Sequence, residues 1–467
     1  MNMQSTLTEQ VPVARALAEF TLGLDAPKVP GEVRARAHHT MLDAAGIALA
    51  STRYSFAHPV LAGLQALGDR GEVPVFGMAA RLSPRDAATM NGFLCHGLDY
   101  DDTHIAGIIH ATASLLPACF SAAAMNGASG RALITAYVAG IEAVTRLGMA
   151  ARGAFHQAGF HPTGMIGIFG CVLAAGRLMG LNATQLENAQ GLALSMASGS
   201  LEFLEDGASN KRFHPGWAAS SALTACAVAR EGFKGVSAPY DGRFGLYNIY
   251  GGKYADWFDF SGLTAGLGTD WELMNVAIKP YPTCHFTHAA IDCTLALRDR
   301  APLDRIAKVE AFVPQEVHKT ICEPEANKRR PQNDYDAKFS THFLVGTALK
   351  HGRLGLAELE PDYLVDPDVQ ALMDLTTCAP YGEGPFPAAY SGRVRITLTD
   401  GTVLEHDEPV NRGAADRPLS NAEIIEKYRA NAALWAGPDR VAEMEAAMLG
   451  LDGADDAASA LARFSAA

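Results

Sequence analysis

The sequence lacks the features that mark membrane-spanning, secreted and CxxC-containing proteins. No segment offers about 18 consecutive apolar residues, and residues 1–11 show no charged start followed by an apolar run, the pattern of a secretory signal. The eight cysteines include no CxxC pair, which argues against a zinc site of that type or a redox dithiol. We therefore expect a cytoplasmic protein that has no membrane partner.

Several motifs and a surplus of positive charge are also absent. The chain has no Walker loop, no GxGxxG fingerprint after a strand, no GxSxG and no HExxH, so a nucleotide cofactor is not indicated. The 38 Lys and Arg residues face 51 Asp and Glu residues, for a net charge of -13. The one short basic run, residues 328–330, is too small to bind nucleic acid. We expect neither a nucleic-acid partner nor a cofactor.

Apolar residues make up 48% of the 467 residues, enough to build two domains with cores of their own. The first half of the chain is rich in Ala, Leu, Met and Gly with helical periodicity. The clearest expected helices span residues 33–50, 84–98, 132–151, 163–179 and 218–231. Because helices this uniformly apolar pack among other helices, the fold is predicted to be mainly α, with a large all-helical domain.

The pattern changes after about residue 270. Residues 308–313 and 393–406 alternate polar and apolar side chains, and the second stretch contains Asp400-Gly401, a hairpin turn signal. Two helices are expected in the same region, at 287–298 and 341–351. We assign residues 270–412 to a smaller α+β lid domain, and residues 1–269 with 413–467 to a discontinuous helical domain.

The most informative stretch is residues 96–110, which holds three aspartates and three histidines between apolar segments. Carboxylates that share a partly dry site shift one another's pKa, and a nearby imidazole becomes an acid or base near neutral pH. Three interpretations remain open: a divalent metal bound by Asp and His, a proton-transfer site in which one aspartate orients an imidazole, or a structural network at a helix end.

Two further clusters lie at expected helix starts. His161 precedes Pro162, so that an imidazole and free backbone N–H groups meet where a helix begins, which is either an anion-binding corner or a helix cap. Lys211, Arg212 and His214 form either a clamp for a carboxylate or a solvated surface loop.

The remaining candidates lie in the expected α+β domain. Two prolines stiffen the segment that holds Lys279, Tyr281 and His285, and these side chains are expected to face a cleft between the domains. Lys338 precedes a helix and either reaches this cleft or faces solvent.

Four motifs, taken in order along the chain, resemble those of the MmgE/PrpD family, which includes 2-methylcitrate dehydratase, cis-aconitate decarboxylase and iminodisuccinate epimerase. They are Asn91-Gly92 with the run from His96 to His104, Phe160-His161-Pro-Thr-Gly164, the segment 206–216, and Lys279-Pro-Tyr-Pro282. The resemblance implies a helical domain that holds both termini, a smaller α+β lid domain, a homodimer, and an interdomain cleft that needs no metal or organic cofactor.

The same resemblance places Asp99, Thr103, His110, His161 and Lys211 at the reaction centre. Our hypothesis makes His110 and His161 the acid/base pair, with Asp99 orienting one imidazole and Lys211 neutralising a substrate carboxylate. The substrate-binding candidates are Thr103, His214, Lys279, Tyr281, His285 and Lys338.

Members of the family act on small di- and tricarboxylates by moving a proton at a carbon next to a carboxylate. The resemblance therefore implies a cofactor-independent lyase for a small anionic polycarboxylate. A dehydratase like 2-methylcitrate dehydratase is the first interpretation, an epimerase or isomerase the second and a cis-aconitate-type decarboxylase the third. Decarboxylation ranks last because Cys284 stands where the decarboxylase branch carries a histidine. A metal-dependent hydrolase built on the Asp/His run is the alternative from another class.

Overall fold

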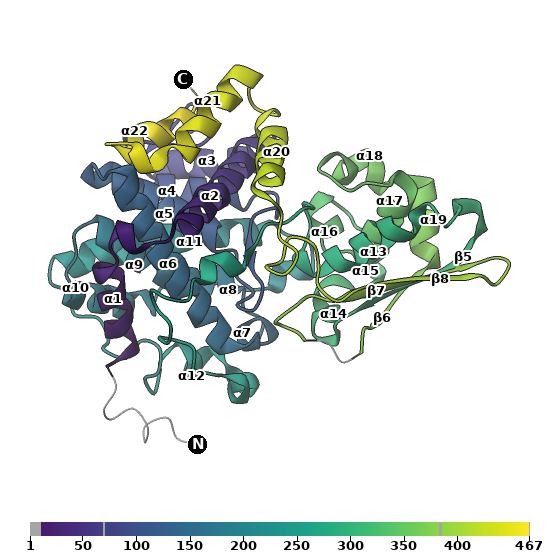
Figure 1. Ribbon diagram of the computed structural model, residues 1–467, viewed down its shortest axis with the longest axis horizontal. Helices are drawn as coiled ribbons and strands as arrows, with labels where there is room; N and C mark the ends of the chain where they lie inside the picture. The colour runs from purple at the N-terminus through teal and green to yellow at the C-terminus, as the bar shows by residue number, and fades with distance from the viewer. Residues whose placement is uncertain (1–10, 69–70, 383–384, 467) are drawn as a thin grey trace.

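The computed structural model describes residues 11–68, 71–382 and 385–466, so that residues 1–10, the start of the predicted helical domain, lie outside the described residues. The fold is mainly α, as predicted. Figure 1 shows a large helical body and, beside it, a smaller part with the longest strands.

The helices of the first part of the chain are α1 (Val13–Gly23), α2 (Gly31–Ser51), α3 (Ala57–Leu67), α4 (Pro84–Cys95), α5 (Ala111–Asn126), α6 (Gly130–Ala151), α7 (Ala154–Gln157), α8 (Pro162–Met165), α9 (Gly167–Leu178), α10 (Ala183–Ala193), α11 (Asn210–Arg230) and α12 (Leu246–Tyr250).

The helical body is built around helices that are buried on all sides. Every residue of α5 from Ala111 to Ala123 is buried, and so are most residues of α2 and α6. Helix α6 is long and apolar enough to cross a membrane, but 89% of its most apolar window lies inside the protein. Its apolar side chains therefore belong to the core of the helical body.

Helices α4 and α11 cross at two glycines. A Cβ atom at Gly92 would lie 2.6 Å from the Cα of Gly216, and a Cβ atom at Gly216 would lie 2.1 Å from the carbonyl oxygen of Thr89. No side chain therefore separates the two helices at this point. The close crossing holds Lys211, on α11, next to the loop that follows α4.

Two of the predicted helices differ most from the structure in their boundaries. The helix predicted at 163–179 is divided at Ile166 into α8 and α9. The helix predicted at 218–231 begins earlier, at Asn210, since α11 accommodates Pro215 in its interior. A proline near a helix start is usually a boundary signal, which is why the sequence placed the start too late.

The smaller part contains a four-stranded sheet in the order β6–β5–β7–β8. Its strands are β5 (Ile306–Val313), β6 (Thr376–Pro380), β7 (Gly392–Leu398) and β8 (Val403–Glu408). Strands β5 and β6 are parallel, and the other two pairs are antiparallel. The predicted hairpin around Asp400-Gly401 is confirmed as β7 and β8, and every second residue of β7 is buried.

In the described part of this region, the α-helices beside the sheet are α13 (His288–Arg298), α14 (His318–Ile321), α15 (Glu325–Lys328), α16 (Asp334–Ala337), α17 (Thr341–His351), α18 (Pro361–Leu364) and α19 (Pro367–Leu375). The helices predicted at 287–298 and 341–351 correspond to α13 and α17. Helix α13 packs against β7 and β8, and α17 packs against β6. A hydrophobic cluster that includes Val309, Val394 and Ile396 lies between the sheet and its helices.

The last helices return to the first part of the chain, as the yellow segment of Figure 1 shows. They are α20 (Asn421–Ala432), α21 (Pro438–Leu449) and α22 (Ala457–Leu461). Helices α20 and α21 pack on α2, while α22 packs on α5. A short sheet links distant segments, because β3 (Thr103–His104) pairs antiparallel with β4 (Val276–Ala277). This pairing brings Lys279 next to the Asp/His run. The other short pair is β1 (Val73–Pro74) with β2 (Arg81–Leu82).

Candidate active site

The Asp/His run forms a buried loop after α4. The helix predicted at 84–98 ends already at Cys95, and Asp99 takes a left-handed backbone conformation with φ of 51°. Few residues other than glycine adopt this conformation, although aspartate tolerates it better than most. The tight turn directs the Asp99 carboxylate towards two lysines. Neither its backbone angle nor these partners can be read from helical periodicity.

Asp99 is fully buried between the ammonium groups of Lys211 and Lys279. The Nζ atom of Lys211 donates to both carboxylate oxygens at 2.9 and 3.0 Å, and Nζ of Lys279 donates to one of them at 2.8 Å. Burial alone would raise the pKa of Asp99, but the two ammonium groups hold it well below its usual range. The site therefore contains an ionised carboxylate with two cations.

The orienting role that we predicted for Asp99 is wrong in this structure, because Asp101 pairs with an imidazole instead. Nδ1 of His96 lies 2.8 Å from a carboxylate oxygen of Asp101, and both side chains are fully buried. Burial alone would raise the pKa of Asp101, but His96 and His110 lower it by more, so that Asp101 is ionised. The hydrogen bonds of Asp99 go to lysines, and none joins it to an imidazole among the described residues.

The third aspartate of the run is in a different state. Asp102 accepts hydrogen bonds from the backbone N–H and the hydroxyl of Thr112, which also contacts Tyr137. Burial, together with the neighbouring charge of Asp101, raises the pKa of Asp102 to about 7, although the hydrogen bonds from Thr112 lower it. Asp102 thus lies in the structural part of the network.

His110 has a defined tautomer. Its Nδ1 lies 2.8 Å from the carbonyl oxygen of Asp102 and 3.2 Å from Oγ1 of Thr103. A carbonyl oxygen only accepts, so Nδ1 carries the proton and Nε2 keeps its lone pair. Burial, with Lys279 nearby, holds the pKa of His110 well below its usual range. The imidazole is therefore neutral and available as a base.

His161 lies beside His110, with 5.8 Å between the two ring centroids. Its Nδ1 is 3.0 Å from Nδ1 of His214, and its Nε2 has no hydrogen-bond partner among the described residues. Burial and Lys211 hold the pKa of His161 well below its usual range. Burial lowers the pKa of His214 to about 4. His214, which we predicted to bind the substrate, contacts the His161 imidazole and does not line the cavity described next.

A narrow cavity opens between these groups and the smaller part of the protein. The volume of the cavity is about 40 Å³, so that a di- or tricarboxylate fits only when the cavity widens. Its lining side chains with polar or reactive groups are Thr103, His110, His156, His161, Lys211, Cys284, His285, Thr320 and Tyr390. Apolar side chains such as Phe203 and Phe339 complete the wall. Polar groups that converge from an apolar wall are typical of a small-molecule site.

The structure distributes the other predicted site residues differently. His285 lines the cavity, with Nε2 2.6 Å from the Asn411 side-chain amide. Tyr281 does not reach the cavity, because its hydroxyl donates to Asp292 at 2.7 Å within an apolar cluster. Lys338 does not reach it either, since its Nζ donates to the Leu98 carbonyl at 2.6 Å.

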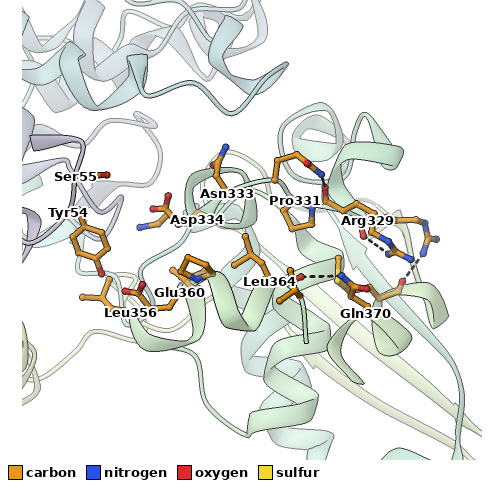
Figure 2. A pocket seen from close by; sticks show the side chains of 17 residues that line it. Tyr54, Ser55, Arg329, Pro331, Asn333, Asp334, Leu356, Glu360, Leu364 and Gln370 are labelled. Atoms are coloured by element: carbon orange, nitrogen blue, oxygen red, sulfur yellow. Dashed lines mark hydrogen bonds between the residues drawn. The ribbon is translucent and has the colours of Figure 1, made fainter. Parts of the chain in front are cut away.

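A second, larger groove is lined in part by Lys338. Figure 2 shows Tyr54 and Ser55 at one end of this groove, Arg329 and Gln370 at the other, and Asp334 between them. None of the histidines of the cavity lines it. The chemistry of the Asp/His run is therefore not accessible from this groove.

Two sets of side chains have donor atoms within 4.8 Å of one another, as a metal ion would require: His96, His110 and His161, and His96, Asp99, Asp101 and His110. In the second set, the carboxylate oxygens already accept hydrogen bonds from lysine and histidine. Lys211 and Lys279 also oppose a further cation at either set, since they lower the pKa of His110 as well as that of Asp99. The donor atoms thus fit proton transfer better than metal binding.

Sequence reasoning assigned no catalytic or binding role to three contributors to the site. His96 and Asp101 belong to the Asp/His run, but the order of residues in a turn does not reveal which aspartate pairs with which imidazole. His156 also lines the cavity, and burial lowers its pKa to about 3. Its place on the short helix α7 gives no sequence signal.

The comparisons with known proteins agree with these motifs. A model of the MmgE/PrpD N-terminal domain matches residues 15–257, and a model of the MmgE/PrpD C-terminal domain matches residues 281–452. The chain belongs to the MmgE/PrpD family. The two family models together span both the helical body and the sheet, so the family relation covers most of the chain.

Relatives within the MmgE/PrpD family have different names. The chain is 26% identical to the cis-aconitate decarboxylase-like protein oryM of Aspergillus oryzae, over 98% of this chain and 99% of that protein. It is 26% identical to the cis-aconitate decarboxylase of Mus musculus, over 92% of this chain and 88% of that protein. It is 25% identical to the 2-methylcitrate dehydratase of Cupriavidus necator, over 80% of each chain. These relatives support enzyme activity of the lyase class.

Proposed function

We propose that the protein is a cofactor-independent lyase for a small di- or tricarboxylate, with dehydration of the 2-methylcitrate dehydratase type as its reaction. One observation carries the proposal: two neutral imidazoles, His110 and His161, share a buried cavity with the ammonium group of Lys211. Elimination of water requires a base, an acid and a stabiliser of negative charge. The cavity offers a group for each task.

The proposed base is His110, since its bare Nε2 accepts a proton from the carbon next to a substrate carboxylate. The electron pair of the broken C–H bond forms the new C=C bond. Hydroxide leaves from the neighbouring carbon and departs as water after protonation. Lys211 neutralises the carboxylate whose adjacent carbon becomes electron-rich in the transition state.

The proposed acid is His161. The free cavity disfavours an imidazolium, because burial and Lys211 both act against it. A bound polycarboxylate brings negative charge into the same space and raises the pKa of neighbouring imidazoles. His161 therefore takes up a proton together with the substrate and passes it to the leaving hydroxyl. Thr103 and His285 are the proposed hydrogen-bonding partners of the substrate, since both line the cavity.

We propose that residues 270–412 act as a lid domain over the helical domain formed by residues 1–269 and 413–467. The cavity supports this division, since His110, His161 and Lys211 come from the first segment while Cys284, His285 and Tyr390 come from the second. Closure of two domains excludes water and completes the catalytic groups around a substrate.

Incubation with 2-methylcitrate, cis-aconitate and other di- and tricarboxylates in deuterated water tests the reaction, followed by NMR. Dehydration is expected to give new alkene signals with no loss of carbon. Deuterium at carbon in an otherwise unchanged substrate would instead indicate epimerisation. Absence of any change across the panel would contradict the proposal of a polycarboxylate enzyme.

Decarboxylation of the cis-aconitate type is the second candidate, because the cis-aconitate decarboxylase of Aspergillus terreus matches 94% of this chain while the dehydratase matches 80%. In this reaction a C–C bond breaks, carbon dioxide leaves, and one protonated imidazole supplies the proton to the carbanion. It requires an acid without a base. Release of carbon dioxide in the same NMR experiment distinguishes it from dehydration.

We also propose that the protein is a cytoplasmic homodimer. Phe213 and Trp217 on α11 and Leu67 at the end of α3 are exposed large apolar side chains beside one groove. A contiguous apolar face of this kind favours association with another protein surface. Light scattering of the wild type and of Trp217→Glu tests it, and a monomeric wild type would contradict the proposal.

A further inference from the structure

Four consecutive carbonyl groups of the loop after α4 are held by four different cations. The carbonyl oxygens of residues 97–100 each accept one hydrogen bond at 2.6–2.8 Å, from Arg212, Lys338, Lys279 and Lys427 in this order. All four basic side chains are buried, and burial lowers the pKa of Lys338 to about 7. We call this arrangement the carbonyl cage.

We infer that Arg212, Lys338 and Lys427 are positioning residues, which fix the reaction centre through the backbone of residues 97–100. The inference rests on the proposed function, since it assumes that Asp99 and its neighbours belong to that centre. Lys279 contacts the Asp99 carboxylate directly, so it belongs to the site itself.

The location of the loop explains why cations are needed. The last carbonyls of a helix lack partners within the helix, and the carbonyls of the residues beyond it lie in buried surroundings here. The negative end of the helix dipole also favours positive charge at this place. Hydrogen bonds from charged donors are stronger than those between neutral groups. The cage therefore holds a backbone that would otherwise be unsatisfied.

The cations have no room to serve as a substrate clamp. Arg212 lies between the rings of Phe56 and Tyr335, at 4.0 Å from each centroid, and also pairs with Asp334. Lys427 pairs with Asp43 at 2.8 Å. Neither these two side chains nor Lys338 line the cavity. Their action on the chemistry must pass through the loop.

The cage also joins distant parts of the molecule at one loop. Arg212 comes from α11, Lys427 from α20, and Lys338 from the segment just after α16, beside the sheet. The loop carries Asp99 in its left-handed conformation, followed by Asp101. Loss of one cation frees a carbonyl to rotate, which moves the Asp99 carboxylate away from Lys211 and disturbs the pairing of Asp101 with His96.

The substitution Lys338→Met tests the inference against a matched control, Lys328→Met. Both lysines are 1% exposed and lie in the same segment, but Lys328 donates to none of the cage carbonyls and lies over the Phe339 ring at 6.0 Å. A purely structural role predicts similar effects of the two changes. A positioning role predicts that only Lys338→Met lowers kcat, by about tenfold or more, since small displacements of catalytic groups are costly.

A second measurement needs no substrate. In protein with 15N-labelled histidine, Lys338→Met is expected to shift the ring signals of His96 and His110, assigned with His96→Gln and His110→Gln, while Lys328→Met leaves them in place. If both lysine variants share one kcat and one histidine spectrum, the inference is wrong. If the wild type turns over no polycarboxylate, the proposed function fails and the spectra alone decide the inference. Lys427→Met tests the same loop from the helical body if Lys338→Met does not fold.

Discussion

The Nδ1 atom of His110 lies 2.8 Å from the carbonyl oxygen of Asp102, which fixes the imidazole as the tautomer with a bare Nε2. The same imidazole has a pKa well below its usual range, mainly because it is buried. A base must be unprotonated to work, so a lowered pKa extends its active form to lower pH. This relationship defines the pH dependence of the free enzyme.

We predict that kcat/KM rises as the pH falls from about 8 to about 6.5, because His161 takes up a proton together with the substrate, and that it declines only below about 6.5, the usual pKa of histidine. The decline comes only at low pH because kcat/KM reports the protonation of the free enzyme, in which burial keeps the base His110 neutral. The measurement is kcat/KM with the identified substrate from about pH 5 to about pH 8. A decline of kcat/KM towards low pH with its midpoint at or above the usual pKa of histidine would show that the base is not this buried imidazole.

Lys211→Ala and His161→Ala are each expected to lower turnover by about a hundredfold or more, because one removes the electrostatic stabiliser and the other an acid/base partner. Folding is expected to be nearly intact, since Lys279 still pairs with the Asp99 carboxylate in the first variant. Circular dichroism and steady-state kinetics measure the two effects. Lys308→Ala, at an exposed residue of β5, serves as the control. Unchanged rates in both site variants would refute the assignment.

The stability of the Asp102→Asn variant, compared with that of the wild type, is expected to increase as the pH rises. The pKa of the buried Asp102 is about 7, above the usual value of the unfolded chain, so the folded wild type holds a proton that the unfolded chain releases. Stability from this group is therefore present at low pH and lost as the pH rises through about 4 to about 7. The asparagine variant does not lose stability in this way, and its side-chain oxygen still accepts the hydrogen bond from the backbone N–H of Thr112.

Urea unfolding of the wild type and of Asp102→Asn at about pH 5 and about pH 7 measures this difference. Other titrating groups cancel in the comparison. The stability difference is expected to move in favour of the variant by about 2 kcal/mol, since one pKa unit corresponds to about 1.4 kcal/mol. Parallel pH curves would mean that burial does not perturb Asp102.

Removal of divalent metal is expected to leave turnover unchanged. The carboxylates of Asp99 and Asp101 are used by lysine and histidine partners, which leaves the donor set poorly suited to a cation. Elemental analysis of the purified protein and turnover after treatment with a chelator are the measurements. Loss of activity that is restored by one metal would favour the metal-dependent hydrolase instead.

Local sequence signals predicted the elements well where backbone and side chains are coupled over short distances. Alternation around Asp400-Gly401 gave the hairpin, and the boundaries of α17 match the prediction because a Ser340 cap and an ending Gly352 in left-handed conformation define it. The loop after α4 was not predictable in the same way. Its turn at Asp99 depends on cations from distant segments, which no local pattern contains.

The candidate site was predicted as a set of residue types more successfully than as a geometry. The motifs identified Asp99, His110, His161 and Lys211, which the structure brings together. The same reasoning could not distinguish the environment of Tyr281, whose hydroxyl meets Asp292 one helix away. Which partner a polar side chain meets is decided by tertiary packing rather than by its neighbours in sequence.

The crossing of α4 and α11 gives a last prediction, since the two helices touch through glycines. A Cβ atom at Gly216 would lie 2.1 Å from the carbonyl oxygen of Thr89, and backbone cannot move aside as a side chain can. Gly216→Ala is therefore expected to destabilise the protein by about 3 kcal/mol, a cost typical of overpacking. Displacement of α11 is also expected to separate Lys211 from Asp99 and lower turnover. Gly63→Ala is the control, because a Cβ atom there meets nothing within 4 Å and alanine favours the exposed helix α3. Urea unfolding should place Gly216→Ala below the wild type and Gly63→Ala at or above it, and equal midpoints for the wild type and Gly216→Ala would contradict the close crossing.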